Sequence, residues 1–324
     1  MKHLLILALS LIPFLSYSQD RWNIQPDGSI KWEVGKDIPH YDHIEMSGEM
    51  VSTVLRYGVN ADGSFRLERS LVWPMLRTIP NNTHASLMQR YAIDFPSFLT
   101  VNGKTLQNEK VHSVSLNGTL VVVSEYSSPV PLLLTRTVFP STTRPMICER
   151  YQLRNNSTKP LTITVPGQKS IYKTDEKTGV EGSYTIESGI LNSGVYNLAP
   201  GQELHFETYI QAYSKTQTAI VPDIDQELNS RLAFVQQMWS DLVFESPDDQ
   251  INKMFAFAKI RASESIYRTR GGLMHGPGGE SYYAAIWAND QAEYVGPFFP
   301  YLGYKTGNEA SLNAYQHFAR FMNK

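Results

Sequence analysis

Alternating apolar and polar residues run through much of the chain. From Trp22 to about Tyr213, short β-branched and aromatic runs are separated by turns rich in Gly, Pro and Asn. In "SIKWEV", for example, Ile30, Trp32 and Val34 fall on one face of a predicted strand. The Asp62–Gly63 step in "NADGSF" favours a hairpin turn. This repeated design predicts a large antiparallel β-sandwich over residues 19–221.

After residue 221 the apolar residues take up the spacing of helices. Residues 222–245 predict a linker helix with Asp223 at its N-cap. A second helix is predicted from Ser246, with Ser246 as the cap and Pro247 in the first turn. Its predicted buried stripe consists of Ile251, Met254, Phe255, Ala258 and Ala262. A last helix is predicted from a similar repeat of Leu312, Tyr315, Phe318, Ala319 and Met322.

The predicted helices of residues 246–324 present wide apolar faces. Such faces need partners to bury them. The amphipathic pattern is still running at Lys324, and no capping glycine follows it. We therefore expect the sequence to be the N-terminal piece of a longer protein, with further helices after Lys324. The predicted fold class is a β-sandwich followed by an all-α segment.

The N-terminal 18 residues have the features of a secretory signal peptide. Lys2 and His3 precede the apolar stretch "LLILALSLIPFLSY", and small residues allow cleavage after Ser18. The alternative is a buried N-terminal helix. The single cysteine, Cys148, excludes an internal disulfide, which fits a periplasmic or secreted protein without a disulfide framework. The stretch is too short to span a bilayer, so we expect no membrane span after cleavage.

The net charge of −2 and the absence of a basic stripe argue against a nucleic-acid partner. No His, Cys and Asp residues have zinc-ligand spacing, and no Gly-x-Ser-x-Gly motif occurs. We therefore expect neither a metal nor another cofactor.

The segment "GGLMHGPGGESYYAAIWANDQAEYVGPFFPYLG" carries the candidate chemistry. Five glycines lie within its first nine residues, and they allow sharp turns and close approach of the backbone to a ligand. On a helix, Trp287, Asp290 and Tyr294 would share one face. A sugar pocket needs an aromatic platform and a carboxylate that accepts hydrogen bonds from hydroxyls. The pattern predicts that residues 270–294 form part of such a pocket.

The order of sandwich, linker helix and helical hairpins resembles the six-hairpin glycosidases, which include glucoamylase-like and rhamnosidase-like enzymes. The local resemblance lies in "SYYAAIWANDQAEYVGPFFPYLG", where Trp287, Asn289 and Asp290 match a Trp-x-Arg-Asp motif with Asn in place of Arg. The resemblance implies an N-terminal β-supersandwich and the first helices of an (α/α)6 barrel. It also implies that Asp290 binds sugar hydroxyls, and that the catalytic acid and base lie beyond Lys324.

Each candidate residue also has an alternative interpretation. Asp290 could be a helix-start carboxylate and Trp287 a core residue. His275 could bind substrate or lie exposed in the loop. Arg270 could bind a substrate hydroxyl or complement the end of the preceding helix. Glu280 could be a charge near a helix cap or a catalytic carboxyl group.

These observations favour a periplasmic glycoside hydrolase acting on oligo- or polysaccharides. Two other functions stay open. The sandwich could be a non-catalytic glycan-binding or docking module, or the chain could belong to a disaccharide phosphorylase of the same architecture.

Overall fold

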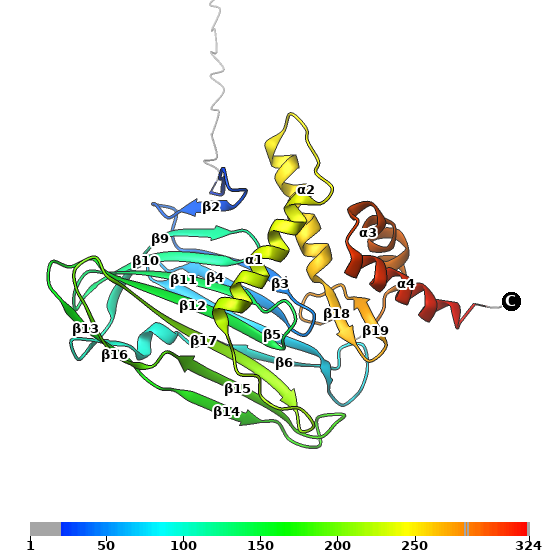
Figure 1. Ribbon diagram of the computed structural model, residues 1–324, viewed down its shortest axis with the longest axis horizontal. Coiled ribbons are helices and arrows are strands. Elements are labelled where there is room, and N and C mark those ends of the chain that lie inside the picture. Colours follow the sequence, from blue (N-terminus) through cyan, green and yellow to red (C-terminus); the bar gives the residue numbers. More distant parts are fainter. Residues whose placement is uncertain (1–20, 282, 284, 323–324) are drawn as a thin grey trace, which may run out of the picture.

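The computed structural model describes residues 21–281, 283 and 285–322 (Figure 1). The predicted signal peptide lies outside the described residues. The largest element is a nine-stranded antiparallel sheet. In spatial order its strands are β1 (Asn23–Ile24), β2 (Ile30–Glu33), β9 (Gln107–Leu116), β10 (Leu120–Ser128), β11 (Leu132–Pro140), β12 (Met146–Asn155), β17 (Glu203–Ser214), β15 (Tyr184–Leu191) and β14 (Lys169–Lys173).

Two smaller antiparallel sheets pack on one face of this large sheet. The first contains β3 (His40–Ser47), β4 (Ser52–Val59), β5 (Phe65–Arg77) and β6 (Ser86–Tyr91) in that order. The second has the order β16 (Gly194–Leu198), β13 (Leu161–Val165), β7 (Thr100–Val101) and β8 (Lys104–Thr105). A short 3-10 helix, η1 (Phe95–Phe98), joins the two regions.

Two apolar clusters fill the space between the layers. One joins the large sheet to β3–β6 through side chains such as Trp32, Leu55 and Trp73. The other lies beneath β13 and β16 and includes Tyr151 and Phe206, whose rings stack 4.6 Å apart. Alternate residues along the strands enter these clusters, as a half-buried sheet requires. The predicted β-sandwich is therefore confirmed.

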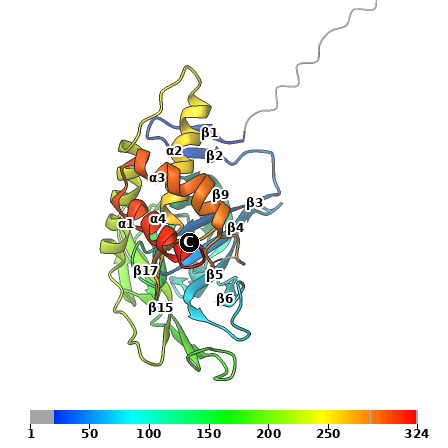
Figure 2. The same cartoon turned by 90° about the vertical axis from the view of Figure 1, so that its right-hand side faces the viewer.

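Helix α1 (Ile224–Ser240) covers the outer face of the large sheet, so the sheet lies between α1 and β3–β6 (Figure 2). The predicted N-cap is confirmed, since the Asp223 carboxylate accepts a hydrogen bond from the Gln226 backbone N–H. Val235 and Met238 are buried, whereas Leu232 on the same helix is exposed.

Helix α2 (Asp249–Glu264) begins later than predicted. Its N-cap is Asp248, whose carboxylate accepts from the backbone N–H groups of Gln250 and Ile251, so the prediction of Ser246 was wrong. A carboxylate also suits the positive end of the helix dipole. The predicted buried stripe was wrong as well, because Met254 is 67% exposed. The side chains that face the rest of the protein are those of Ala256, Lys259, Ile260, Ser263 and Glu264.

The chain then forms a two-stranded hairpin, β18 (Ile266–Thr269) and β19 (Gly272–His275), where the sequence predicted the end of a helix followed by a glycine-rich loop. A π-helical stretch (η2, Asp290–Val295) runs into α3 (Gly296–Leu302), and α4 (Lys305–Ala319) follows. The predicted buried face of α4 was wrong. Its buried residues are Gly307, Ala310, Ser311 and Ala314, and Leu312 is 61% exposed.

A buried polar network joins the sandwich to the helices. Arg231 of α1 donates hydrogen bonds to the backbone carbonyls of Gly118 and Ser47, 2.7 and 2.9 Å away, and forms an ion pair with Glu264 of α2. Arg261 of α2 pairs with Glu264 at 3.0 Å and with Glu45 of β3 at 2.8 Å. Because these groups leave water on folding, their mutual pairing is needed to offset desolvation.

Among the described residues, no helix is both long and apolar enough to cross a membrane.

Candidate functional site

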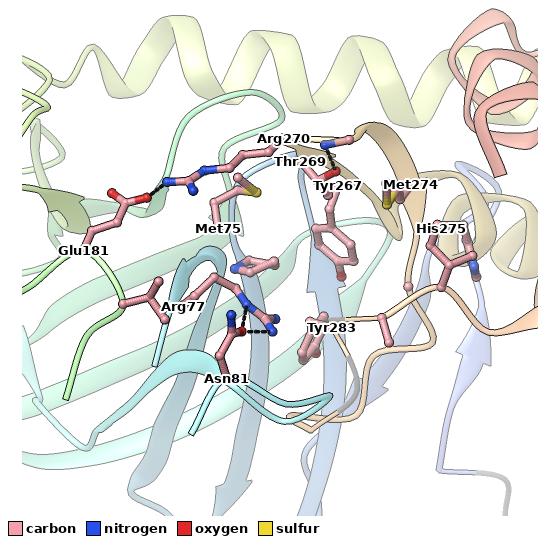
Figure 3. Close-up of a pocket in the computed structure, with 16 residues that line it drawn as sticks. Met75, Arg77, Asn81, Glu181, Tyr267, Thr269, Arg270, Met274, His275 and Tyr283 are labelled. Carbon is pink, nitrogen blue, oxygen red and sulfur yellow. Dashed lines mark hydrogen bonds and ion pairs between the residues drawn. The ribbon is translucent and has the colours of Figure 1, made fainter. Parts of the chain in front are cut away.

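A cavity of about 440 Å³ opens where the β18–β19 hairpin and the glycine-rich loop meet the sandwich (Figure 3). The loop supplies Gly276, Tyr283, Ala285 and Ile286 to its wall. Its other lining residues are Pro74, Met75, Arg77, Asn81, Val180 and Glu181 from the sandwich and Tyr267, Thr269, Arg270, Gly271, Met274 and His275 from the hairpin region. Cavities of this size, largely apolar with a few polar groups, are typical of sites for small molecules.

Two tyrosines form the aromatic part of the wall. The rings of Tyr267 and Tyr283 pack edge to face with centroids 5.4 Å apart. The Tyr267 hydroxyl donates to Ser47 Oγ at 3.0 Å, and the Tyr283 hydroxyl donates to the Glu45 carboxylate. Burial raises the pKa of Tyr267 to about 12. Both hydroxyl groups therefore form hydrogen bonds with side chains of the sandwich, and both tyrosines line the cavity.

His275 is the buried polar group of the site. The sequence left two interpretations of His275, a substrate-binding residue or an exposed loop residue. The second was wrong, because the residue is only 8% exposed. Burial, assisted by the positive charge of Arg261, lowers the pKa of His275 to about 4, so the imidazole is neutral near pH 7. Its Nδ1 atom is buried and has no hydrogen-bond partner among the described residues. A buried polar atom without a partner is costly unless a ligand or water satisfies it.

Charged and amide groups form the rim. Arg270 pairs with Glu181 across the cavity, so the hairpin turn is tied to the loop between β14 and β15 (Figure 3). Arg77 donates from Nε to Asn81 Oδ1 at 2.9 Å. Because α2 ends at Glu264, Arg270 does not lie in the last turn of a helix, and the alternative interpretation of this residue was wrong.

The other four predicted binding residues are not among the described residues that line the cavity. They are Trp287, Asn289, Asp290 and Tyr294. Trp287 and Asp290 are half-buried, and Asn289 and Tyr294 are exposed. The predicted shared face assumed a regular α-helix, but residues 290–295 are π-helical, and the Gly296 N–H donates to the carbonyl of Gln291, five residues back. The wider turn changes which side chains align. The structure therefore brings Arg270 and His275 together and leaves the other four apart from them.

Glu280 lies outside this cavity, beside a separate hollow of about 420 Å³. Its carboxylate forms ion pairs with Arg56 at 2.7 Å and Arg90 at 3.1 Å. The hydrogen bond from Arg56 is the main reason that the pKa of Glu280 falls to about 2. A carboxyl group that stays ionised at neutral pH cannot donate a proton there, so this geometry does not suit Glu280 as a general acid.

Several cavity residues were missed by reasoning from the sequence. Met75, Arg77 and Glu181 come from segments of the sandwich far from the loop, and no local pattern marks them. Tyr267 could have been found. "IYRTRGGLMH" has a β-branched and aromatic run, two glycines and a second short run, which is typical of a hairpin.

Within the described part of the chain, no three His, Cys, Asp or Glu residues lie together as a metal site would require.

Comparison with known proteins gives a structural match only. No protein-family model matches the chain, and no curated protein matches its sequence. A solved structure from the human microbiome, which carries the assignment kojibiose phosphorylase, superposes with a TM-score of 0.52 over 86% of this chain at 8% identity. The chain shares this fold. The chain spans about half of that solved protein, 47% of its length.

Proposed function

We propose that this chain is the sandwich-bearing part of a carbohydrate-active enzyme and that the cavity binds a sugar unit. The observation that carries the proposal is that the neutral, buried His275 lines the same cavity as Tyr267 and Tyr283. A sugar hydroxyl can form a hydrogen bond with a neutral imidazole, which offers one donor and one acceptor nitrogen. Tyrosine rings suit the C–H faces of a sugar. The shared fold with an assigned phosphorylase supports the same class of function.

The proposed reaction is cleavage of a glycosidic bond by water, as in a hydrolase. Phosphorolysis is the second candidate, favoured by the assignment of the structural match. The two reactions differ in the group that attacks the sugar, which is water in one and phosphate in the other. We propose the activity for a whole protein of which the cavity is one part, with the catalytic carboxyl groups on barrel loops.

Individual residues have distinct proposed roles. Arg270 and His275 contact the sugar in the cavity. Asp290, which does not line the cavity, accepts hydrogen bonds from hydroxyls of a sugar that extends beyond the cavity, and its neighbours in the sequence Trp287, Asn289 and Tyr294 belong to the same outer part of the site. Trp287 directly follows Ile286, which lines the cavity. We also propose that the N-terminal segment directs export to the periplasm.

Calorimetric titration of the chain with α-linked disaccharides, kojibiose among them, tests the binding step. We expect measurable binding, and about fivefold weaker binding by His275→Leu, since one lost hydrogen bond is worth about 1 kcal/mol. Tyr301→Ser, at an exposed position outside the cavity, is the control and should bind like the parent. A folded parent chain that binds none of the sugars would contradict the proposal.

Product analysis separates the two reactions. A protein that contains this chain and releases free sugar whether or not phosphate is present is a hydrolase. Formation of a sugar 1-phosphate only when inorganic phosphate is added identifies a phosphorylase.

A further inference from the structure

The glycine-rich loop is held in an unusual backbone conformation at Glu280. This residue has φ of +69°, and it follows Gly278 and Gly279 with φ of +86° and +71°. Glycine adopts such angles freely, but a glutamate there is strained. Strained residues persist where the surrounding structure holds them in place, and they are often found at functional sites.

The Glu280 carboxylate bridges two strands of the β3–β6 sheet. Its Oε1 lies 2.7 Å from Nη1 of Arg56 on β4, and its Oε2 lies 3.1 Å from Nη2 of Arg90 on β6. Strand β5 lies between these two strands, so the carboxylate spans it. The side chain is only 14% exposed, which limits screening of the pairs by solvent. Its low pKa, caused first by the Arg56 hydrogen bond, keeps it ionised.

The residues on either side of Glu280 are attached to the same part of the sandwich. The Gly279 N–H donates to Oε2 of Glu45 at 3.1 Å. The Tyr283 hydroxyl contacts Ser52 Oγ at 2.9 Å and donates to Oε1 of Glu45. A Cβ atom at Gly278 would clash with that oxygen, and the φ of +86° there also favours glycine. The loop is thus attached to the sandwich at Gly279, Glu280 and Tyr283, just before Ala285 and Ile286, which line the cavity together with Tyr283.

We infer that Glu280 is a positioning residue that fixes the glycine-rich loop on the sandwich so that Tyr283, Ala285 and Ile286 form one wall of the cavity. Glu280 acts through these residues and does not line the cavity itself. The part of this inference that concerns ligand affinity rests on the proposed sugar-binding function. The part that concerns loop order does not.

Hydrogen–deuterium exchange of the full chain tests the loop directly. Glu280→Gly removes both ion pairs and also relieves the strained backbone angle, so we expect a melting temperature close to that of the parent. The described amides of the loop, such as those of Gly278, Gly279, Tyr283 and Ala285, should nevertheless exchange roughly tenfold faster or more, because the ion pairs that hold the loop on the sandwich are lost. Glu280→Gln keeps oxygen and shape but loses the charge, and should give an intermediate rate.

Glu68→Gln is the matched control. Glu68 on β5 lies 3.5 Å from the same Arg56 guanidinium but is not part of the loop. This variant should keep the exchange rates of the parent. Unchanged loop exchange in Glu280→Gly would overturn the inference, and so would faster exchange spread evenly over the sandwich.

Titration with kojibiose, or with another disaccharide that the parent binds, supplies the functional measurement. Glu280→Gly should bind more weakly at an unchanged melting temperature, a combination that general destabilisation would not produce. If Glu280→Gly loosens the loop but binds the sugar as the parent does, the positioning role is wrong. If the parent binds no sugar, the proposed function fails, while the exchange experiment still decides whether Glu280 fixes the loop.

Discussion

At the scale of single residues, the burial of His275 has a consequence for stability. Its pKa is about 4 in the folded protein, against 6.5 for a free imidazole. Above about pH 6.5 the group is neutral in both the folded and the unfolded state. As the pH falls from 6.5 to 4, the unfolded chain takes up a proton that the folded chain does not, so the free energy of unfolding decreases. The total loss should be about 3 kcal/mol, at 1.36 kcal/mol per pKa unit.

Thermal melts of the parent and of His275→Gln across this pH range measure the effect. The variant should lose the part of the pH dependence that His275 causes. His43→Gln, at an exposed position, should retain the full dependence. Identical pH dependence in the parent and His275→Gln would show that His275 is not held neutral.

At the scale of elements, the start of α2 tests the observed cap. The Asp248 carboxylate accepts hydrogen bonds from two backbone N–H groups of the first turn, 2.8 and 3.4 Å away. Asp248→Ala should lower the free energy of unfolding by about 1 kcal/mol, because those N–H groups lose their partner. Asp249→Ala removes a neighbouring carboxylate whose only contribution here is a favourable interaction with the helix dipole. This change should lower the free energy of unfolding by a few tenths of a kcal/mol. Denaturant titration compares the two, and an equal loss would contradict the cap assignment.

At the scale of the whole molecule, the Arg231 network joins the sandwich to both long helices. Arg231 and Glu264 are almost completely buried. Arg231→Met leaves two buried carbonyls and one carboxylate oxygen without their donor. We therefore expect the free energy of unfolding to fall by about 3–5 kcal/mol. Arg150→Met is the control, since its ion pair with Asp225 joins β12 to α1 at the surface and should contribute about 0–1 kcal/mol. Equal losses in denaturant unfolding would mean that the buried network does not hold these parts together.

Local patterns in the sequence determined much of the sandwich. The alternation at Trp32 and its neighbours, the Asp62–Gly63 turn and the Asp223 cap are all present in the structure. Each depends on interactions between residues close in the chain, such as turn geometry, capping bonds and the two-residue period of a strand. Such features can be predicted from the sequence because their physical cause lies within a few residues.

Only the tertiary structure decided which helix faces are buried and which side chains share the cavity. In α2 and α4 the predicted apolar stripe is not the face that packs, because the neighbouring elements meet small residues such as Ala256 and Ala310 and polar ones such as Lys259. The cavity brings Arg77 and Glu181 to His275 across about a hundred or more positions of the chain. His275 itself is buried by packing partners such as Phe299, whose ring lies 6.3 Å away. No local period encodes such contacts, since burial depends on which surfaces meet after the strands and helices have formed.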